Sequence, residues 1–181
     1  GKTYTYTVSK AGYVTKRATV EASAGTTSVP VTLEKAPASS LVDFDSAWPS
    51  FRGSDDNMAI VDAKTPRTAD ETKTLWNTKL TSGWDRVSNT LIVGDNLYAL
   101  AGTEIKKIDK ATGNVIATGA LASDNSWYDG RLAYGDGMLF VTVNGRVQAL
   151  NAATLESLWV SEELGGSTTT PISYKDGYVY T

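Results

Sequence analysis

The residues of this sequence best suited to ligand chemistry are aromatic side chains that stand beside charged ones. Two such segments begin 43 residues apart: residues 84–86 read Trp-Asp-Arg, and residues 127–131 read Trp-Tyr-Asp-Gly-Arg. Aromatic rings can stack on sugar rings or on peptide groups, while the neighbouring charges supply hydrogen bonds. The competing interpretation is that both indole rings are buried in a core. The candidate ligand contacts are Trp84, Trp127, Tyr128 and Arg131.

A second polar group, Asp55-Asp56-Asn57 followed by Asp62, has the oxygen ligands that a calcium ion prefers. The central Gly and final Glu of an EF-hand loop are missing, so we interpret this stretch as a solvated acidic loop. The pair Asp70-Glu71 is interpreted in the same way, as exposed charge. We therefore expect no metal site.

The composition argues against most enzyme chemistry. The 181 residues include no Cys and no His, which excludes disulfides, thiolate ligands and the commonest general base at neutral pH. The formal charge of -3 comes from interspersed signs, whereas nucleic-acid binding needs a basic face. No apolar stretch approaches the roughly 20 residues of a membrane-spanning helix. We expect a noncatalytic chain with no cofactor, no nucleic-acid partner and no membrane span.

The aromatic candidates belong to a repeat of about 41 residues. Leu75-Trp76 recurs as Leu158-Trp159, 83 residues later, and the turn residues Asp95, Asp136 and Asp176 lie 41 and 40 residues apart. In the second copy, apolar alternation and the Gly-Asp-Gly and Asn-Gly turns predict strands over residues 131–134, 138–143, 146–150 and 157–160. Four short antiparallel strands per repeat are typical of a β-propeller blade.

Residues 149–159, Ala-Leu-Asn-Ala-Ala-Thr-Leu-Glu-Ser-Leu-Trp, resemble the tryptophan-docking motif of pyrroloquinoline-quinone-like propeller repeats. That motif reads Ala, x, Asp, x, x, Thr, Gly, three residues, Trp, so that Asn151 replaces the Asp and Leu155 the Gly. The earlier copy has Lys107 for the Ala and Ala117 for the Trp. Residues 48–53, Trp-Pro-Ser-Phe-Arg-Gly, resemble the segment before the first blade in secreted members.

The resemblance implies that the motif residues are structural, with the Trp stacked between blades and the Asp or Asn and the Thr capping a turn. These residues are Trp76, Asp109, Thr112, Gly113, Asn151, Thr154 and Trp159. Quinone-dependent dehydrogenases of this fold hold their cofactor under a vicinal disulfide, with calcium and a catalytic Asp beside it. Because this chain has no Cys, we expect no such site in it.

The N-terminal residues form a separate pattern. Alternation over residues 4–8, 18–22 and 29–33 predicts three strands, and the pattern resembles the last part of the small β-sandwich modules of bacterial surface proteins. Residues 36–44 contain the small residues and proline of a linker. We expect an all-β chain with a partial β-sandwich module over residues 1–35. A linker over 36–44 and an incomplete propeller of about three four-stranded blades over 45–181 should follow.

From the resemblance, we expect a binding or scaffolding module of a larger bacterial protein, secreted or at the cell surface, whose propeller loops face a protein or glycan partner. Because three blades do not close a ring, the open strand edges could also pair with a second copy. Two alternatives stay open. The chain could be part of a quinone-dependent oxidoreductase whose cofactor site lies elsewhere, or a scaffold of the outer-membrane assembly type.

Overall fold

The computed structural model describes residues 2–8, 16–22, 25, 28–34, 41–54, 58–60, 64–82, 86–122, 131–165 and 171–181. Within these ranges the protein is all-β: several antiparallel sheets form, none of them closed, and the helical content is one 3-10 turn, Ala69–Glu71. The described part of the chain has no helix with the length and apolar character needed to cross a membrane. Contacts divide the chain into two compact units, Gly1–Ser40 and Leu41–Thr181.

The first unit contains a two-stranded antiparallel sheet of β1 (Lys2–Val8) and β2 (Lys16–Ala22). The predicted third strand over residues 29–33 is wrong, because the described residues 28–34 pair with no strand. Pro30 lies in the middle of that stretch and has no amide hydrogen to donate, so it interrupts a strand ladder.

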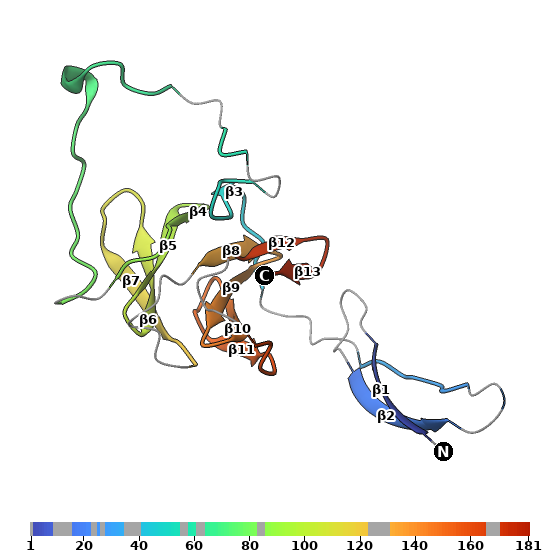
Figure 1. The fold of residues 1–181 in the computed structure, drawn as a ribbon. Helices are drawn as coiled ribbons and strands as arrows, with labels where there is room; N and C mark the ends of the chain where they lie inside the picture. The colour runs from blue at the N-terminus through green and yellow to red at the C-terminus, as the bar shows by residue number, and fades with distance from the viewer. Residues whose placement is uncertain are drawn as a thin grey trace. The chain divides into compact units, whose positions relative to one another are not determined.

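The second unit contains three antiparallel sheets (Figure 1). The first sheet has the order β3-β4-β5-β6-β7, the second has β11-β10-β9-β8, and the third is the β12-β13 hairpin. The strands of the first sheet are β3 (Ser46–Trp48), β4 (Leu91–Val93), β5 (Asn96–Ala101), β6 (Glu104–Asp109) and β7 (Val115–Ala120). The others are β8 (Leu132–Gly135), β9 (Met138–Val143), β10 (Arg146–Asn151), β11 (Ser157–Val160), β12 (Ser173–Lys175) and β13 (Tyr178–Tyr180).

Local turn chemistry explains why these hairpins form where the sequence predicts them. Both central residues have positive φ in the turns Asp136-Gly137, Asn144-Gly145 and Asp176-Gly177. Asn, Asp and Gly are the residues that tolerate this backbone conformation, which matches the twist of the flanking strands. The four strands predicted in the second repeat are confirmed, each to within one residue at either end.

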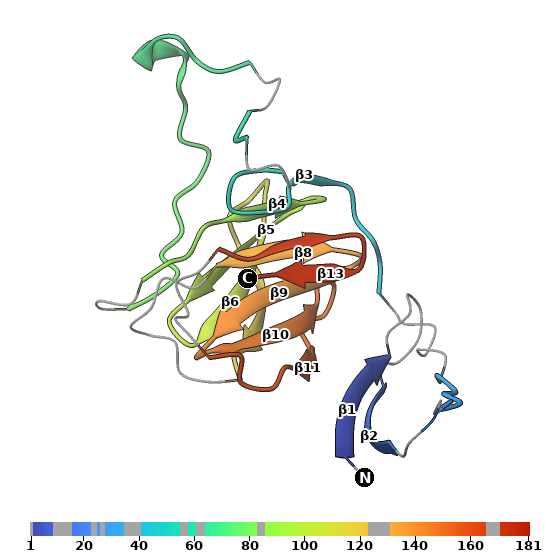
Figure 2. The same ribbon diagram turned by 45° about the vertical axis from the view of Figure 1, so that its right-hand side comes forward.

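The three sheets of the second unit lie face to face as layers (Figure 2). A core of aliphatic side chains and two tyrosines fills the space between the first and second sheets. A smaller cluster around Phe140 and Ile172 lies between the second sheet and the hairpin. The first strands of consecutive repeats are β4, β8 and β12. They are neighbours, because β4 contacts β8 and β8 contacts β12. Instead of about three four-stranded blades, the described residues contain two four-stranded repeats and a two-stranded hairpin, because residues 171–181 supply only two strands of the third repeat.

Residues 41–54, which we call the inner segment, run across the first strands of the sheets. β3 pairs with β4, and the carbonyl oxygen of Pro49 accepts a 2.7 Å hydrogen bond from the Tyr134 amide in β8. The Tyr134 hydroxyl in turn accepts a hydrogen bond from the Phe44 amide and donates one to Asp43 Oδ1. The inner segment thereby connects the first sheet to the second.

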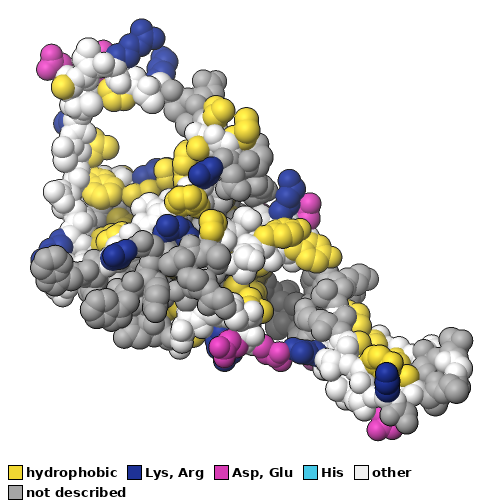
Figure 3. All heavy atoms as spheres, viewed as in Figure 1, with side chains coloured by type: hydrophobic (Ala, Val, Ile, Leu, Met, Phe, Trp, Pro, Cys, Tyr) yellow, Lys and Arg dark blue, Asp and Glu magenta, His cyan; other side chains and the backbone are white. Residues whose placement is uncertain are grey.

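Residues 64–82, which we call the strap, pass along the outside of the first sheet. Figure 3 shows an opening between the raised part of the chain that includes the strap and the rest of the unit. Trp76 and Thr78 attach the strap to the turn between β6 and β7: Trp76 Nε1 donates to the Lys110 carbonyl at 3.0 Å, and Thr78 Oγ1 donates to the Gly113 carbonyl at 2.6 Å. Unlike its repeat counterpart in β11, the Leu75-Trp76 stretch belongs to no strand.

Candidate ligand-binding site

The segments that join consecutive repeats carry the aromatic candidates and leave from one end of the sheets. Backbone hydrogen bonds run there from Gly102 to Arg86 and from Leu121 to Thr103, so the segment before β4 and the segment after β7 both meet the β5–β6 turn. Trp84, Trp127 and Tyr128 lie outside the described residues. The residues that flank them in the sequence are described.

Two side-chain amides fix the ends of the segment that carries Trp127 and Tyr128. Gln148 of β10 is 1% exposed, and its Oε1 accepts a 2.8 Å hydrogen bond from the Ala122 amide at the start of that segment. At the other end, Asn89 Oδ1 accepts from the Leu132 amide at 3.1 Å, and Asn89 Nδ2 donates to the Leu132 carbonyl at 3.4 Å. An amide side chain can both donate and accept, which lets it substitute for a strand partner. Ala122 and Leu132, which flank residues 123–130 in the sequence, are therefore each held by a side-chain amide.

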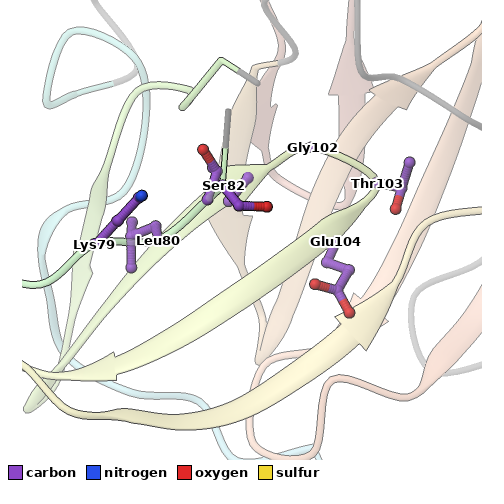
Figure 4. Close-up of a pocket in the computed structure, with 8 residues that line it drawn as sticks. Lys79, Leu80, Ser82, Gly102, Thr103 and Glu104 are labelled. Carbon is purple, nitrogen blue, oxygen red and sulfur yellow. The ribbon is translucent and has the colours of Figure 1, made fainter. Parts of the chain in front are cut away.

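A hollow of about 370 Å³ lies beside these anchors, between the strap and the β5–β6 turn. Lys79, Leu80 and Ser82 come from the strap, whereas Gly102, Thr103 and Glu104 come from the turn and the start of β6 (Figure 4). Thr81 and Ala101 complete the lining. Trp84 follows Ser82 by two residues in the sequence, and the segment that carries Trp127 begins beside the turn that lines the hollow.

The two charged side chains in the described lining, Glu104 and Lys79, differ in whether they form an ion pair. Lys106 Nζ lies 2.5 Å from Glu104 Oε2, and the Lys106 side chain is mostly buried, so the Glu104 carboxylate is neutralised locally. Lys79 makes no ion pair with any residue in the described ranges. The lining therefore combines one available cation with the hydroxyls of Thr81, Ser82 and Thr103.

Arg131, the one candidate ligand contact among the described residues, lies 4.9 Å from the ring centroid of Phe51. Arg52 approaches the same ring at 5.9 Å. A guanidinium over an aromatic face is held by the ring quadrupole. The structure therefore places Arg131 against the inner segment, in a contact that the sequence analysis did not anticipate.

The predicted turn caps are confirmed in both copies of the repeat. Asp109 Oδ1 accepts hydrogen bonds from the amides of Ala111 and Thr112 and from Thr112 Oγ1. These bonds, above all the one from the Thr112 hydroxyl, hold the pKa of Asp109 below its usual value. Asn151 Oδ1 likewise accepts from the amides of Ala153 and Thr154. An uncharged amide oxygen can replace the carboxylate because the cap needs only an acceptor.

The position after the capping Thr has a left-handed backbone in both copies, with φ of +75° at Gly113 and +64° at Leu155. Gly113 lies directly under the ring of Trp76, and a Cβ there would overlap the indole. Leu155 is instead buried between the sheets and packs near Ala117, the residue that stands where the motif has Trp. Leu155 thus keeps a left-handed φ that is unfavourable for a residue with a Cβ.

Trp159 is not stacked between sheets as expected. It is 42% exposed, and its ring lies 6.0 Å from that of Phe140. The reason is that Trp159 is on β11, the fourth strand of its sheet, whereas the covering hairpin has two strands and reaches only β8 and the neighbouring core. Hydrophobic side chains also lie exposed over β12 and β13 (Figure 3), among them Tyr178 and Tyr180.

Replacing Gly113 with alanine should displace Trp76 from the turn. The left-handed φ alone costs about 1–2 kcal/mol for a residue with a Cβ, and the overlap with the indole adds to that cost. We expect a lower free energy of unfolding and a red shift of the tryptophan emission. Gly177→Ala is the matched control, since Gly177 has φ +84° and open space around it. Equal destabilisation by both variants, with no emission change for Gly113→Ala, would contradict the docking role.

The opposite end of the sheets carries carboxylates on the turns and the inner segment. A shallow hollow there of about 700 Å³ is lined by Asp43, Asp45 and Asp95 together with Phe44 and Gly94. Among the described residues, no three acidic side chains are grouped closely enough to hold a metal ion. The sequence candidates for a calcium loop, Asp55, Asp56, Asn57 and Asp62, lie outside the described residues.

No protein-family model matches this sequence, and no curated protein matches it either.

Sequence reasoning missed the residues that build the site, Asn89, Gln148 and Lys79. A signal existed for Gln148, because it interrupts the apolar run Val147-Gln148-Ala149-Leu150, and a polar residue in a buried strand needs partners. Asn89 and Lys79 lie in irregular chain, where polar residues are common and carry no comparable signal.

Proposed function

We propose that the second unit is a noncatalytic glycan-binding module, an incomplete β-propeller of the pyrroloquinoline-quinone-like type from a bacterial secreted or surface protein. Two successive four-stranded repeats whose sheets pack face to face, with neighbouring first strands and equivalent turn caps, support the propeller assignment. The observation that carries the function is the hollow between the strap and the β5–β6 turn, whose lining combines a lysine with hydroxyl and backbone groups.

The chemistry of the hollow favours a glycan over a protein partner. Its lining is rich in hydroxyl and backbone groups, which both donate and accept hydrogen bonds, as sugar hydroxyls do. Its size suits a small ligand unit rather than the flat, extended area of a protein interface. Trp84 follows Ser82 by two residues in the sequence, and an aromatic ring is a common platform for a sugar ring.

The test is a glycan array probed with the full chain, followed by titration of the bound glycans by calorimetry. Trp84→Ala and Trp127→Ala should each weaken binding about tenfold, since an aromatic contact contributes on the order of 1–1.5 kcal/mol. Trp159→Ala is the control, because the Trp159 ring lies beside that of Phe140 and Trp159 belongs to the structural repeat. If no glycan binds, or if Trp159→Ala weakens binding as much as the other two, the proposal fails.

A further inference from the structure

We propose that the hollow between the strap and the β5–β6 turn selects a sugar that bears a carboxylate, with Lys79 as the specificity-determining residue. The inference rests on the glycan-binding function proposed above and adds the charge of the ligand. Its starting point is the lining, to which the strap contributes a lysine and both the strap and the turn contribute hydroxyl and backbone groups (Figure 4).

The net charge of the described lining favours an anionic ligand. Among the described residues, Glu104 is the one acidic side chain that lines the hollow, and its Oε2 is engaged by Lys106 Nζ at 2.5 Å. That pair is retained by a second contact, from Lys106 Nζ to Thr118 Oγ1 at 3.5 Å, and only 15% of the Lys106 side chain is exposed. A carboxylate paired in this way adds little repulsion toward an anion. The remaining charge on the described part of the lining is the ammonium of Lys79, which makes that part electropositive.

The position of Lys79 among hydroxyl-bearing residues favours a ligand with both a carboxylate and hydroxyl groups. Lys79, Thr81 and Ser82 follow one another along the strap, opposite Gly102 and Thr103 on the turn. A ligand held there meets one cation and several neutral hydrogen-bonding groups. An ammonium donates up to three hydrogen bonds, and those to a carboxylate are about twice as strong as neutral ones. A uronic acid presents that combination, a ring of hydroxyls with one carboxylate.

The size of the hollow sets the third constraint. About 370 Å³ is near the lower limit of small-molecule sites, which suits a single sugar unit. Leu80 and Ala101 supply the small apolar surface against which the carbon face of such a ring can pack. The ligand is therefore a monosaccharide unit, free or at the end of a chain, rather than a long polyanion.

The experiment compares glucuronate and galacturonate with their methyl esters, which keep the ring but lose the charge. Binding to the full chain is measured by calorimetry, and the amide shifts of Gly102 and Thr103 in NMR spectra locate it. We expect the acids to bind about tenfold more tightly than the esters, the ratio that one charge-assisted hydrogen bond of about 1.4 kcal/mol supplies. The preference should shrink as salt is raised, because the site is open to solvent.

The variant Lys79→Gln should abolish the preference while leaving weak binding of the esters. Lys73→Gln is the matched control: Lys73 is an exposed lysine of the same strap outside the hollow, so its removal should change nothing. Both lysines are exposed, and thermal melting verifies that both variants fold.

The outcomes separate the two proposals. Equal binding of acids and esters, unchanged in Lys79→Gln, would overturn the charge selection and leave glycan binding intact. Binding of the acids without shifts at Gly102 and Thr103 would also overturn it, because the ligand would then be bound elsewhere. If no sugar binds at all, glycan binding itself fails, and the charge selection fails with it.

Discussion

Replacing Phe140 with alanine is expected to lower the free energy of unfolding by about 3–5 kcal/mol, the range measured for buried aromatic truncations. Phe140 is 1% exposed and lies at the centre of the cluster between the second sheet and the β12–β13 hairpin. Its ring stacks on that of Tyr174, with centroids 4.9 Å apart and planes 8° from parallel. Such a loss is a large part of the 5–15 kcal/mol that stabilises a typical domain.

The same substitution should release the hairpin before the rest of the unit unfolds. An isolated two-stranded hairpin is marginally stable in water, and β12–β13 depends on Phe140 and its neighbours for burial. Denaturant unfolding gives the free energy, and amide hydrogen exchange in β12 and β13 reports the release. Phe140→Leu, which keeps most of the apolar volume, should cost much less. A loss below about 1 kcal/mol with unchanged exchange in the hairpin would show that the cluster does not hold it.

Raising the pH above 10 is expected to unfold the second unit, because two buried tyrosines resist ionisation in the folded state. Burial raises the pKa of Tyr134 to about 12, and burial raises the pKa of Tyr98 further. The Tyr98 hydroxyl donates to the Ala152 carbonyl at 2.7 Å between the sheets, so its proton is also needed there.

The direction of this change in stability with pH follows from proton linkage. Below pH 10 both tyrosines are protonated in the folded and the unfolded chain, and their contribution to stability is complete. Between pH 10 and about 12 the unfolded chain releases both protons while the folded chain keeps them, so stability falls. Each tyrosine contributes about 1.4 kcal/mol per pH unit. Burial also raises the pKa of Tyr174, so the three tyrosines together contribute about 4 kcal/mol per unit. Burial lowers the pKa of Lys107, which acts in the opposite direction below the ordinary lysine pKa.

Denaturant titrations from pH 8 to 12, with tyrosinate absorbance at each pH, test this expectation. Tyr98→Phe should be less stable near neutral pH by about 1–3 kcal/mol, because the Ala152 carbonyl loses its partner, yet its stability should fall about two thirds as steeply above pH 10. A pH dependence identical to that of the native chain would mean that Tyr98 ionises normally in the fold. Tyr4, exposed in the first unit, provides the control variant Tyr4→Phe.

The parts of the fold that the sequence predicts are those that local chemistry determines. The hairpin turn Asn144-Gly145 and the caps at Asp109 and Asn151 each depend on residues at most three positions apart, and all were predictable. The pairing of β3 with β4 and the contact of Phe44 with Tyr134 join segments far apart in the chain, and no pattern within either segment indicates its partner.

The candidate site was predictable only in part, for a similar reason. Aromatic residues beside charges marked the joining segments around Trp84 and Trp127, but the residues that anchor and line the site are single polar side chains. Asn89 binds Leu132 across 43 residues, a relation that appears only when two sheets are packed together. The exposure of Trp159 is likewise set by what covers it rather than by its own strand.

The hydrogen bond between the Phe44 amide and the Tyr134 hydroxyl closes a loop of 90 residues, whereas each hairpin of the sheets closes a turn of a few residues. Loop-closure entropy makes such a distant contact late to form, since it gains nothing until both sheets exist. We therefore expect the inner segment to dock after the hairpins of both sheets have formed. Those hairpins and the core between the two sheets come almost entirely from residues outside it.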